Sequence, residues 1–413
     1  MATEWKKGFL NQICRIGDGA HASLKRQTEG ILYLTAKNIT QTGIDLTTVD
    51  YIDEKTFEKH FTEKSSTVSC PKEGDILYSI IGSVGGCYIV KKETIGISSS
   101  VAIFRPDKNK INNLFLYYYI KSPFFYNSIL AIKTGAAQGF MSLGKLGSVE
   151  IKYPESLETQ QKIAGILSAY DDLIEKNRKQ IKLLEEAAQK LYKEWFVKLN
   201  FPGHENVKIV DGVPEGWKKA ELNTVLSKVT TGLNPRKNFV LGKGNNYYVT
   251  IKNMGDNNLY LDDKCDKVDD EALEKINKRS DLQTGDILFS GIGTIGRVYL
   301  VSISTDNWDV SESVFTLRAN EFISKEFLYL LLLSDDMQAY CDLNAHGAAQ
   351  RGIRMADLKA YKFALPNSNL ITRFTKIIAP YISKAQCLKN QNVSLQTARD
   401  KLLPRLMNGD INV

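Results

Sequence analysis

Two glycine-rich stretches contain the residue types that could bind a nucleotide phosphate. Residues 291–296 read Gly-Ile-Gly-Thr-Ile-Gly, a spacing that binds dinucleotides only where a helix follows, because the helix N-terminus must meet the pyrophosphate. The apolar pattern of residues 297–301 predicts a strand there instead. Residues 139–146 resemble a phosphate-binding loop, but Leu146 occupies the place of the hydroxyl that would hold magnesium. We therefore predict turns and no nucleotide site; nucleotide binding by the isolated chain would revive an enzymatic alternative.

Other catalytic arrangements find less support. Asp107 and residues 150–152 fit a metal-dependent nuclease pattern, but the second half of the chain has Asn320 and the run Lys-Phe-Ala at 362–364 in their place. Ser98, Ser99 and Ser100 have no histidine nearby in the sequence. The six cysteines include no Cys-x-x-Cys pair and the four histidines lie far apart, so neither a disulfide framework nor a metal site is indicated. We predict a chain that is not an enzyme, with no metal and no cofactor of its own.

Binding is the chemistry that remains, because several predicted turns combine glycine with hydrogen-bonding side chains. Lysine and arginine suit phosphates and guanine edges, asparagine and glutamine suit adenine edges, and serine or threonine suits either. The net charge of +7 is compatible with a nucleic-acid partner. The candidate DNA-binding residues are Lys37, Asn38, Ser83, Thr134, Gln138, Arg236, Lys252, Asn253, Thr294, Gln350, Arg351 and Arg354.

These candidates recur because the two halves of the chain are copies of one module. Glu-Trp-Lys-Lys at 4–7 returns as Gly-Trp-Lys-Lys at 216–219, and Gly-Asp-Ile-Leu-Tyr-Ser at 74–79 returns as Gly-Asp-Ile-Leu-Phe-Ser at 285–290. Gly-Ala-Ala-Gln occurs at 135–138 and again at 347–350. The shift stays between 211 and 215 residues along the chain, which indicates a tandem duplication with small loop changes.

Each copy reads as a β-rich domain followed by a long helix. Alternating and apolar runs between glycine turns predict strands at 76–81, 87–90 and 101–104, and residues 114–129 predict one helix whose Tyr117, Tyr118 and Tyr119 belong to the core. The predicted segments are a first domain at 1–154, a central helix at 155–198, a linker at 199–215, a second domain at 216–366 and a C-terminal helix at 367–413.

The two long helices carry matching seams of mostly apolar residues at alternating steps of four and three, the period of helices that pack lengthwise on each other. Asn177 interrupts the first seam, and Asn392 and Arg399 interrupt the second. Two such seams in equivalent places predict mutual packing as an antiparallel coiled coil. The apolar seam positions are Ile163, Leu167, Ile174, Ile181, Leu184, Leu191, Ile378, Leu388, Leu395 and Leu402. The predicted fold class is α+β with pseudo-two-fold symmetry.

Composition places the chain among soluble proteins. Hydrophobic residues make up 43% and charged residues 24% of the sequence. The N-terminus lacks the form of a signal peptide, and the longest apolar run, 327–333, is too short to span a membrane. We expect a cytoplasmic protein with no membrane partner.

Four motifs make the chain resemble the specificity subunit of type I restriction-modification systems over essentially its whole length. They are Val-Pro-Glu-Gly-Trp-Lys at 213–218, Lys-Glu-Trp-Phe-Val at 193–197, Ile-Glu-Lys-Asn-Arg-Lys-Gln-Ile at 174–181 and Leu-Leu-Pro-Arg-Leu-Met-Asn-Gly-Asp-Ile at 402–411. The resemblance implies two target recognition domains, each reading one half of a divided double-stranded DNA sequence, with the helix pair as spacer. It also implies two DNA adenine methyltransferase subunits that bind S-adenosylmethionine, and ATP- and Mg-dependent restriction and translocase subunits. Those cofactors would belong to the partners.

Two other functions stay open at this point. The chain could be the recognition subunit of a type II system in which methyltransferase and nuclease are fused, and co-purification would separate that case from type I. Alternatively, it could be a helical assembly scaffold that does not touch DNA. Salt titration of duplex binding would decide this, because phosphate contacts make affinity fall steeply with salt.

Overall fold

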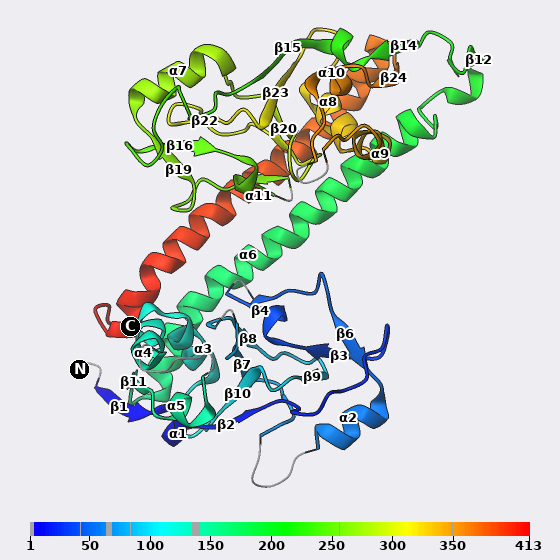
Figure 1. Cartoon of the computed structure of the whole chain (residues 1–413). Coiled ribbons are helices and arrows are strands. Elements are labelled where there is room, and N and C mark those ends of the chain that lie inside the picture. Colours follow the sequence, from blue (N-terminus) through cyan, green and yellow to red (C-terminus); the bar gives the residue numbers. More distant parts are fainter. Residues whose placement is uncertain are drawn as a thin grey trace. The chain divides into compact units, whose positions relative to one another are not determined.

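A computed structural model describes residues 4–41, 43–62, 68–82, 84–133, 141–255, 257–347 and 351–413. The chain divides into two compact units. Unit 1 comprises Met1–Glu175 and Val393–Val413, and unit 2 comprises Lys176–Asn392. Each unit therefore contains one β-rich head together with part of each long helix (Figure 1).

The head of unit 1 is built from small antiparallel sheets and one parallel strand pair. Its four-stranded sheet has the order β2–β10–β7–β8, its three-stranded sheet the order β6–β3–β9 with β3 parallel to β9, and β1–β11 and β4–β5 form two-stranded pairs. The strands are β1 (Trp5–Phe9), β2 (Cys14–Asp18), β3 (Ile31–Leu34), β4 (Ile39–Thr40), β5 (Gly43–Ile44), β6 (Asp50–Ile52), β7 (Ile76–Ser79), β8 (Cys87–Ile89), β9 (Ile95–Ile97), β10 (Val101–Pro106) and β11 (Glu150–Pro154).

The head of unit 2 repeats this topology strand for strand. The orders are β15–β23–β20–β21, β19–β16–β22 with β16 parallel to β22, β14–β24 and β17–β18. The strands are β14 (Lys218–Glu221), β15 (Leu226–Thr231), β16 (Asn246–Val249), β17 (Met254–Gly255), β18 (Asn258–Leu259), β19 (Asp266–Val268), β20 (Ile287–Ser290), β21 (Val298–Leu300), β22 (Trp308–Val310), β23 (Val314–Ala319) and β24 (Lys362–Leu365). The linker between the heads contains a short hairpin, β12 (Ile209–Val210) with β13 (Val213–Pro214). The predicted duplication is thus a duplication of fold.

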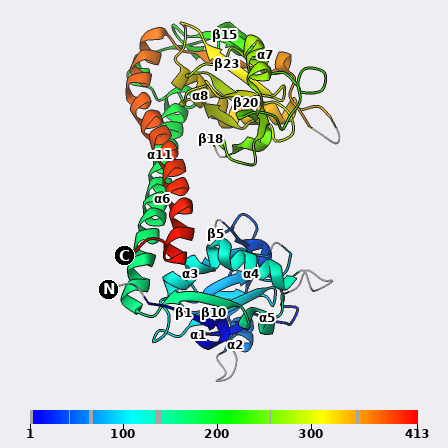
Figure 2. The same cartoon turned by 90° about the vertical axis from the view of Figure 1, so that its left-hand side faces the viewer.

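Short helices cover the sheets of each head. In unit 2, α7 packs against β15 and β22. Figure 2 shows α7 beside β15. The helices of unit 1 are α1 (Leu10–Ile13), α2 (Glu54–His60), α3 (Asn113–Lys121), α4 (Pro123–Lys133) and α5 (Leu143–Gly147), and those of unit 2 are α7 (Asp270–Ser280), α8 (Lys325–Leu333), α9 (Asp335–Leu343) and α10 (Met355–Lys359). Single 3₁₀ turns are η1 (Ala36–Asn38), η3 (His204–Asn206), η4 (Leu222–Val225) and η5 (Ile251–Asn253).

The prediction of one helix over residues 114–129 was wrong, because the chain forms two helices there. Ser122 ends α3 in an extended conformation, and Pro123 starts α4. Proline disfavours a helical conformation in the residue before it and is well tolerated at the first position of a helix. The predicted core role is confirmed for Tyr118 and Tyr119, which are buried, and half-buried Tyr117 packs against the same cluster.

The two long helices are α6 (Leu157–Tyr192), extended by a π-helical turn at η2 (Lys193–Val197), and α11 (Ser368–Asn408). Ser156 caps α6, because its hydroxyl accepts a hydrogen bond from the Thr159 amide at 3.3 Å.

The helices pack antiparallel in both units. In unit 1, Ile163 and Leu167 of α6 share a core with Leu406 near the end of α11. In unit 2, Ile181 packs with Leu388, and further along α6 the aromatic Tyr192 meets Phe374 near the start of α11. The residue numbers of the contacting positions therefore decrease along α11 as they increase along α6, which is an antiparallel arrangement. The predicted fold class, with its antiparallel coiled coil, is confirmed.

Burial along the seams follows the helix pairing. The buried seam residues are Ile163, Leu167, Ile174, Ile181, Ile378 and Leu388, and the half-buried ones are Leu184, Leu191, Leu395 and Leu402.

The polar residues that interrupt the seams pair with one another or with acids on the facing helix. In unit 2, the buried Asn177 amide donates to Asn392 Oδ1 at 2.9 Å and to Gln391 Oε1 at 3.0 Å. In unit 1, Arg399 of α11 forms an ion pair with Asp171 of α6. Asp171 Oδ2 also accepts a hydrogen bond from Tyr118 of α3 at 2.8 Å. Since buried polar groups require partners, these contacts specify one register for the pair.

One buried aspartate-arginine pair occurs in both heads. Arg105 binds Asp75 with an Nη2–Oδ2 distance of 2.7 Å, and Arg318 binds Asp286 with an Nε–Oδ1 distance of 2.6 Å. Both aspartates are buried and follow the repeated glycine of the Gly-Asp turn. Their recurrence at equivalent places of the two heads indicates a role in closing the turn that leads into β7 and β20.

Asp309 in β22 is a buried acid of unit 2 alone. The strand pairing places Asp309 opposite Tyr248, where unit 1 has Gly96 opposite Tyr33. Its carboxylate accepts hydrogen bonds from the Ser280 hydroxyl at 2.6 Å and from the Val310 amide at 2.7 Å. Burial nevertheless raises the pKa of Asp309 from 3.8 to about 6.

We predict that Asp309 makes unit 2 less stable as the pH rises. The folded-state pKa lies above the unfolded value, so the free energy of unfolding falls between about pH 4 and pH 6 and stays low above, by about 3 kcal/mol in total. Asp309→Asn keeps an acceptor oxygen without a charge to desolvate. Urea unfolding followed by tryptophan fluorescence should therefore show the variant to be more stable than the wild type at pH 7.5 but similar to it at pH 4. The exposed control Asp263→Asn should reproduce the wild-type pH profile.

Candidate nucleic-acid interface

The Lys252 turn of unit 2 is held by a reciprocal capping arrangement. Asn253 Oδ1 accepts hydrogen bonds from the Thr250 amide at 2.9 Å and from the Thr250 hydroxyl at 3.1 Å. The buried Asn253 side chain thus closes the turn, and the Lys252 side chain is exposed. The lysine side chain can therefore contact a partner while hydrogen bonds hold the backbone of its turn in place.

A second loop, residues 291–297, connects β20 to β21. The glycine pattern is followed by a strand, as predicted, and Gly293 and Gly296 adopt positive φ angles of 78° and 87°. Ser290 closes the loop: its hydroxyl donates to the Thr294 carbonyl at 2.6 Å and accepts from the Arg297 amide at 2.8 Å. Thr294 is exposed at the tip.

Backbone hydrogen bonds join this loop to a third one at residues 351–354. The Gly293 amide donates to the Arg351 carbonyl at 2.7 Å, and the Ile353 amide donates to the Gly291 carbonyl at 2.8 Å. The Arg351 side chain binds the Asp342 carbonyl at 2.8 Å. Arg351 and Arg354 are both exposed.

Arg297 joins the second loop to the Lys252 turn. Its guanidinium donates to the Ile251 carbonyl at 3.2 Å and to the Met254 carbonyl. The three segments of unit 2 are therefore bonded in series. Each segment carries at least one exposed candidate, and these are Lys252, Thr294, Arg351 and Arg354. Arg236 is exposed on a separate loop, 232–245, between β15 and β16.

Unit 1 repeats two features of this arrangement, the asparagine that closes the lysine turn and the backbone bond between the second and third segments. Asn38 Oδ1 accepts from the Thr35 amide at 3.0 Å, and its Nδ2 donates to the Asp45 and Thr48 carbonyls at 3.2 and 2.9 Å. Lys37 is exposed at the turn. The Met141 amide donates to the Ile80 carbonyl at 3.2 Å, as Ile353 does to Gly291 in unit 2. The candidates Ser83, Thr134, Gln138 and Gln350 lie outside the described residues.

The asparagines differ from the other candidates, because their side chains serve the turns themselves. Both the oxygen and the nitrogen of the Asn38 side-chain amide are occupied by bonds to its own loop, and the Asn253 side chain is buried at the equivalent turn. The exposed cations are better placed to contact a partner.

The position of Arg297 distinguishes the two units. At a shift of 211, Arg297 corresponds to Gly86, which is buried against the Ile39 carbonyl; a Cβ built on Gly86 would lie 1.9 Å from that oxygen. Ile39 in turn corresponds to Met254, whose carbonyl Arg297 binds. In unit 1 the hairpin backbone meets the turn directly, and in unit 2 a guanidinium bridges the two.

Sequence reasoning missed the residues that join the loops. Ser79 plays the part of Ser290, since its hydroxyl accepts from the Gly86 amide at 2.9 Å. The repeated Leu-Tyr-Ser and Leu-Phe-Ser runs could have indicated this pair, but nothing local in the sequence marks Arg297 as a loop bridge.

The part of the chain that the structure describes has neither a metal-binding cluster nor a membrane-spanning helix. No group of three or more His, Cys, Asp or Glu side chains in this part of the chain could hold a metal ion. Among the described helices, none combines the length and apolar character needed to cross a bilayer. What the three loops of unit 2 offer is an exposed set of cations and hydroxyls on a preformed backbone.

Comparison with known proteins gives one consistent result. The family model described as "Type I restriction modification DNA specificity domain" matches residues 2–186 and again residues 214–396. The type I restriction enzyme MjaIX specificity subunit of Methanocaldococcus jannaschii is 26% identical, over 99% of this chain and 94% of that protein. The HindI specificity subunit of Haemophilus influenzae is 24% identical, over 82% of this chain and 87% of its own length. The crystal structure of a type I S subunit from M. genitalium has the same fold, with a TM-score of 0.60 at 16% identity, covering 98% of this chain and 96% of that one.

We predict that Gly86→Ala destabilises unit 1, because the added methyl group would meet the Ile39 carbonyl and force the turn away from the hairpin. The free energy of unfolding should fall by about 1–3 kcal/mol, measured by urea denaturation. Gly144→Ala is the matched control, since a Cβ at Gly144 has no neighbour within 4 Å. Equal stability of the two variants would show that the turn and hairpin are not in contact.

Proposed function

Because the chain belongs to the type I restriction-modification DNA specificity family and carries that domain twice, we propose that each head reads one part of a divided duplex DNA sequence. The chain is the DNA sequence-recognition subunit of such a system and not its catalyst. The observation that carries the two-part reading is the pair of heads with identical strand orders. A protein with two similar reading modules recognises two separated half-sites, as dimeric DNA-binding proteins do.

The contacts to DNA divide by chemistry. Lys37, Lys252, Arg351 and Arg354 suit phosphates or guanine edges, and Thr294 suits either kind of base. Arg236 would act from its own loop. The exposed loop residues of the two heads differ in type, so the two half-sites should differ in sequence.

The long helices supply the spacing and the docking surface in this proposal. Two DNA adenine methyltransferase subunits, which bind S-adenosylmethionine, and ATP- and Mg-dependent restriction and translocase subunits are the expected partners. The support is the family itself, whose relatives are named as subunits of type I restriction enzymes. Affinity purification of the full chain from its host would identify the partners, and recovery of a methyltransferase would support the proposal.

We predict that Lys252→Met and Arg354→Met weaken binding to duplex DNA. Each lost phosphate contact should reduce the slope of log K against log salt by about one. Fluorescence anisotropy with DNA of the mapped target sequence would measure both quantities at several salt concentrations. Lys362→Met is the control, because Lys362 is an exposed cation on β24, in the sheet with β14. An equal loss in all three variants would contradict a contact at the three loops.

We also predict that the helix pair sets the number of unspecified bases between the half-sites. One heptad inserted after Glu175 and one after Asn392 leaves every described contact within each unit intact, and seven residues preserve the seam. A rise of 1.5 Å per residue should lengthen the spacer by about three base pairs. Mapping methylated adenines in cells that express the variant would show this. Insertion into one helix only should abolish assembly, and an unchanged spacer in the double insertion would exclude the helices as ruler.

A further inference from the structure

Lys389 is an unexpected buried cation on α11 in unit 2. Its side chain is only 6% exposed. The ammonium donates to Glu185 Oε1 on α6 at 2.7 Å and to the backbone carbonyl of Asn257 at 2.6 Å. A buried ammonium is stable only with such partners, so both bonds matter to the fold.

The second partner belongs to the loops that present Lys252. Asn257 lies in the turn of the β17–β18 hairpin with a φ of 56°. This hairpin begins directly after the Lys252 turn, and the Tyr260 amide closes it by donating to the Asn253 carbonyl at 2.8 Å. Lys389 therefore connects the long helix to the segment that carries a candidate DNA contact.

The same segment is held from another direction by Arg297. That guanidinium binds the Ile251 and Met254 carbonyls, and Lys389 binds the Asn257 carbonyl. The carbonyls of one short run, 251–257, thus receive bonds from the β20–β21 loop and from α11. Neither cation carries information about DNA by itself; each sets where the Lys252 turn lies.

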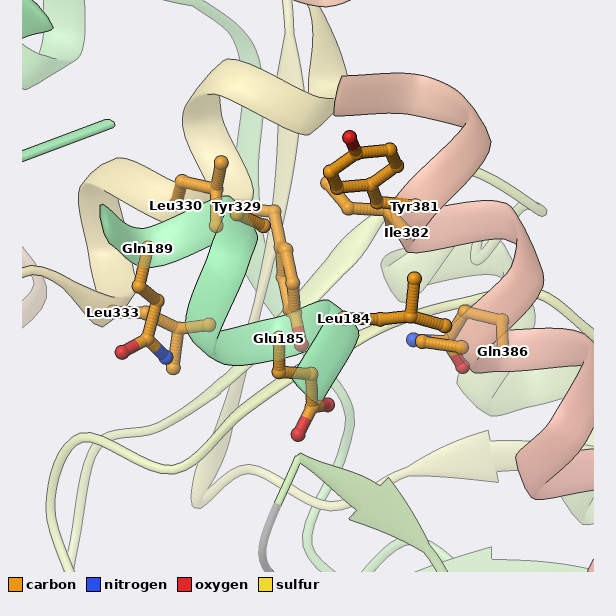
Figure 3. A pocket seen from close by; sticks show the side chains of 11 residues that line it. Leu184, Glu185, Gln189, Tyr329, Leu330, Leu333, Tyr381, Ile382 and Gln386 are labelled. Atoms are coloured by element: carbon orange, nitrogen blue, oxygen red, sulfur yellow. The ribbon is translucent and has the colours of Figure 1, made fainter. Parts of the chain in front are cut away.

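The surroundings of Glu185 shield the ion pair from water. Figure 3 shows Tyr329 of α8 reaching between α6 and α11 toward Glu185. Burial, and then the neighbouring Glu185 carboxylate, raise the pKa of Tyr329, so its hydroxyl stays protonated beside the acid. Leu184, Ala385 and Leu388 pack around the same layer. Low solvent access makes the Lys389–Glu185 attraction stronger than that of a surface pair.

The first copy has a different residue at the matching place. At the shift of 211 that relates the seam residues Leu184 and Leu395, Lys389 corresponds to Arg178. The Arg178 side chain is exposed. The lysine connection is therefore a property of the second copy alone.

We propose that Lys389 is a positioning residue for DNA reading by the second head, which couples the helix pair to the Lys252 turn. The inference rests on the proposed function for its consequence at DNA, but the connection itself can be tested without DNA. Removing the ammonium should release the hairpin, displace Lys252 and weaken recognition of one half-site only.

Hydrogen exchange of the full chain tests the connection. In Lys389→Met, backbone amides of 254–260 should exchange roughly tenfold faster or more, as expected from the loss of a hydrogen bond to a charged group. The unit 1 segment 39–44 should not change. Lys384→Met is the control, because Lys384 is an exposed lysine on the same helix. Wild-type protection of 254–260 in Lys389→Met would overturn the proposal.

A second variant separates hairpin release from damage to the helices. Lys389→Met combined with Glu185→Leu leaves no unpaired carboxylate in the helix pair, yet the hairpin is still released. Fast exchange at 254–260 in this double variant supports the proposal. Restored protection would show that the single variant acted through helix packing and would overturn it.

DNA binding then tests the consequence. Duplexes with base changes confined to one half-site or the other should show that Lys389→Met loses roughly tenfold or more in discrimination at the second head's half-site and none at the first. Equal loss at both half-sites would overturn the assignment to the second head. A wild-type chain that discriminates at neither half-site would instead reject the proposed two-part reading, while the exchange result would still decide the connection.

Discussion

The fold depends on the hydrogen bonds and ion pairs that two long antiparallel helices make across their seam. Apolar seams attract helices but tolerate sliding, whereas a buried amide or charge must meet its partner. Asn177 meets Asn392, and Glu185 meets Lys389 in unit 2; Asp171 meets Arg399 in unit 1. Each pair disfavours a shifted register because a shift would leave a buried or half-buried polar group unpaired. The polar pairs therefore fix the register of the two helices in addition to stabilising their packing.

The heads add a second layer of specification at their loops. Each loop is closed by its own side chains, with Thr250 and Asn253 at one turn and Ser290 at the next. The closed loops are then bonded to each other in series. An ordered backbone of this kind presents cations with little entropy left to lose on binding, which favours specific recognition over non-specific attraction.

Duplication has preserved topology while the contacts between loops diverged. Gly86 and Arg297 occupy equivalent positions, yet one allows direct backbone contact and the other bridges a gap. Likewise Arg178 and Lys389 occupy equivalent helix positions, but Arg178 is exposed whereas Lys389 is buried and bonds a head loop. The strand orders are the same because they bury the same apolar pattern, and the loop contacts differ because each requires only one or two side chains. In the proposed function, this divergence is what would let two heads of one fold read different sequences.

The amino-acid sequence by itself determined the duplication, the β-rich heads, the long helices and their antiparallel packing. Repeated motifs and the spacing of apolar residues can be read directly from the order of residues, without knowledge of tertiary contacts. It also predicted the strand that follows the glycines of residues 291–296, where a dinucleotide site requires a helix. Only the tertiary structure decided that Asn38 and Asn253 close their own turns, that Arg297 bridges two loops, and that Lys389 reaches Asn257 across 132 residues of chain. Such contacts depend on which loop the fold brings opposite a given side chain, and neither residue type nor spacing contains that information.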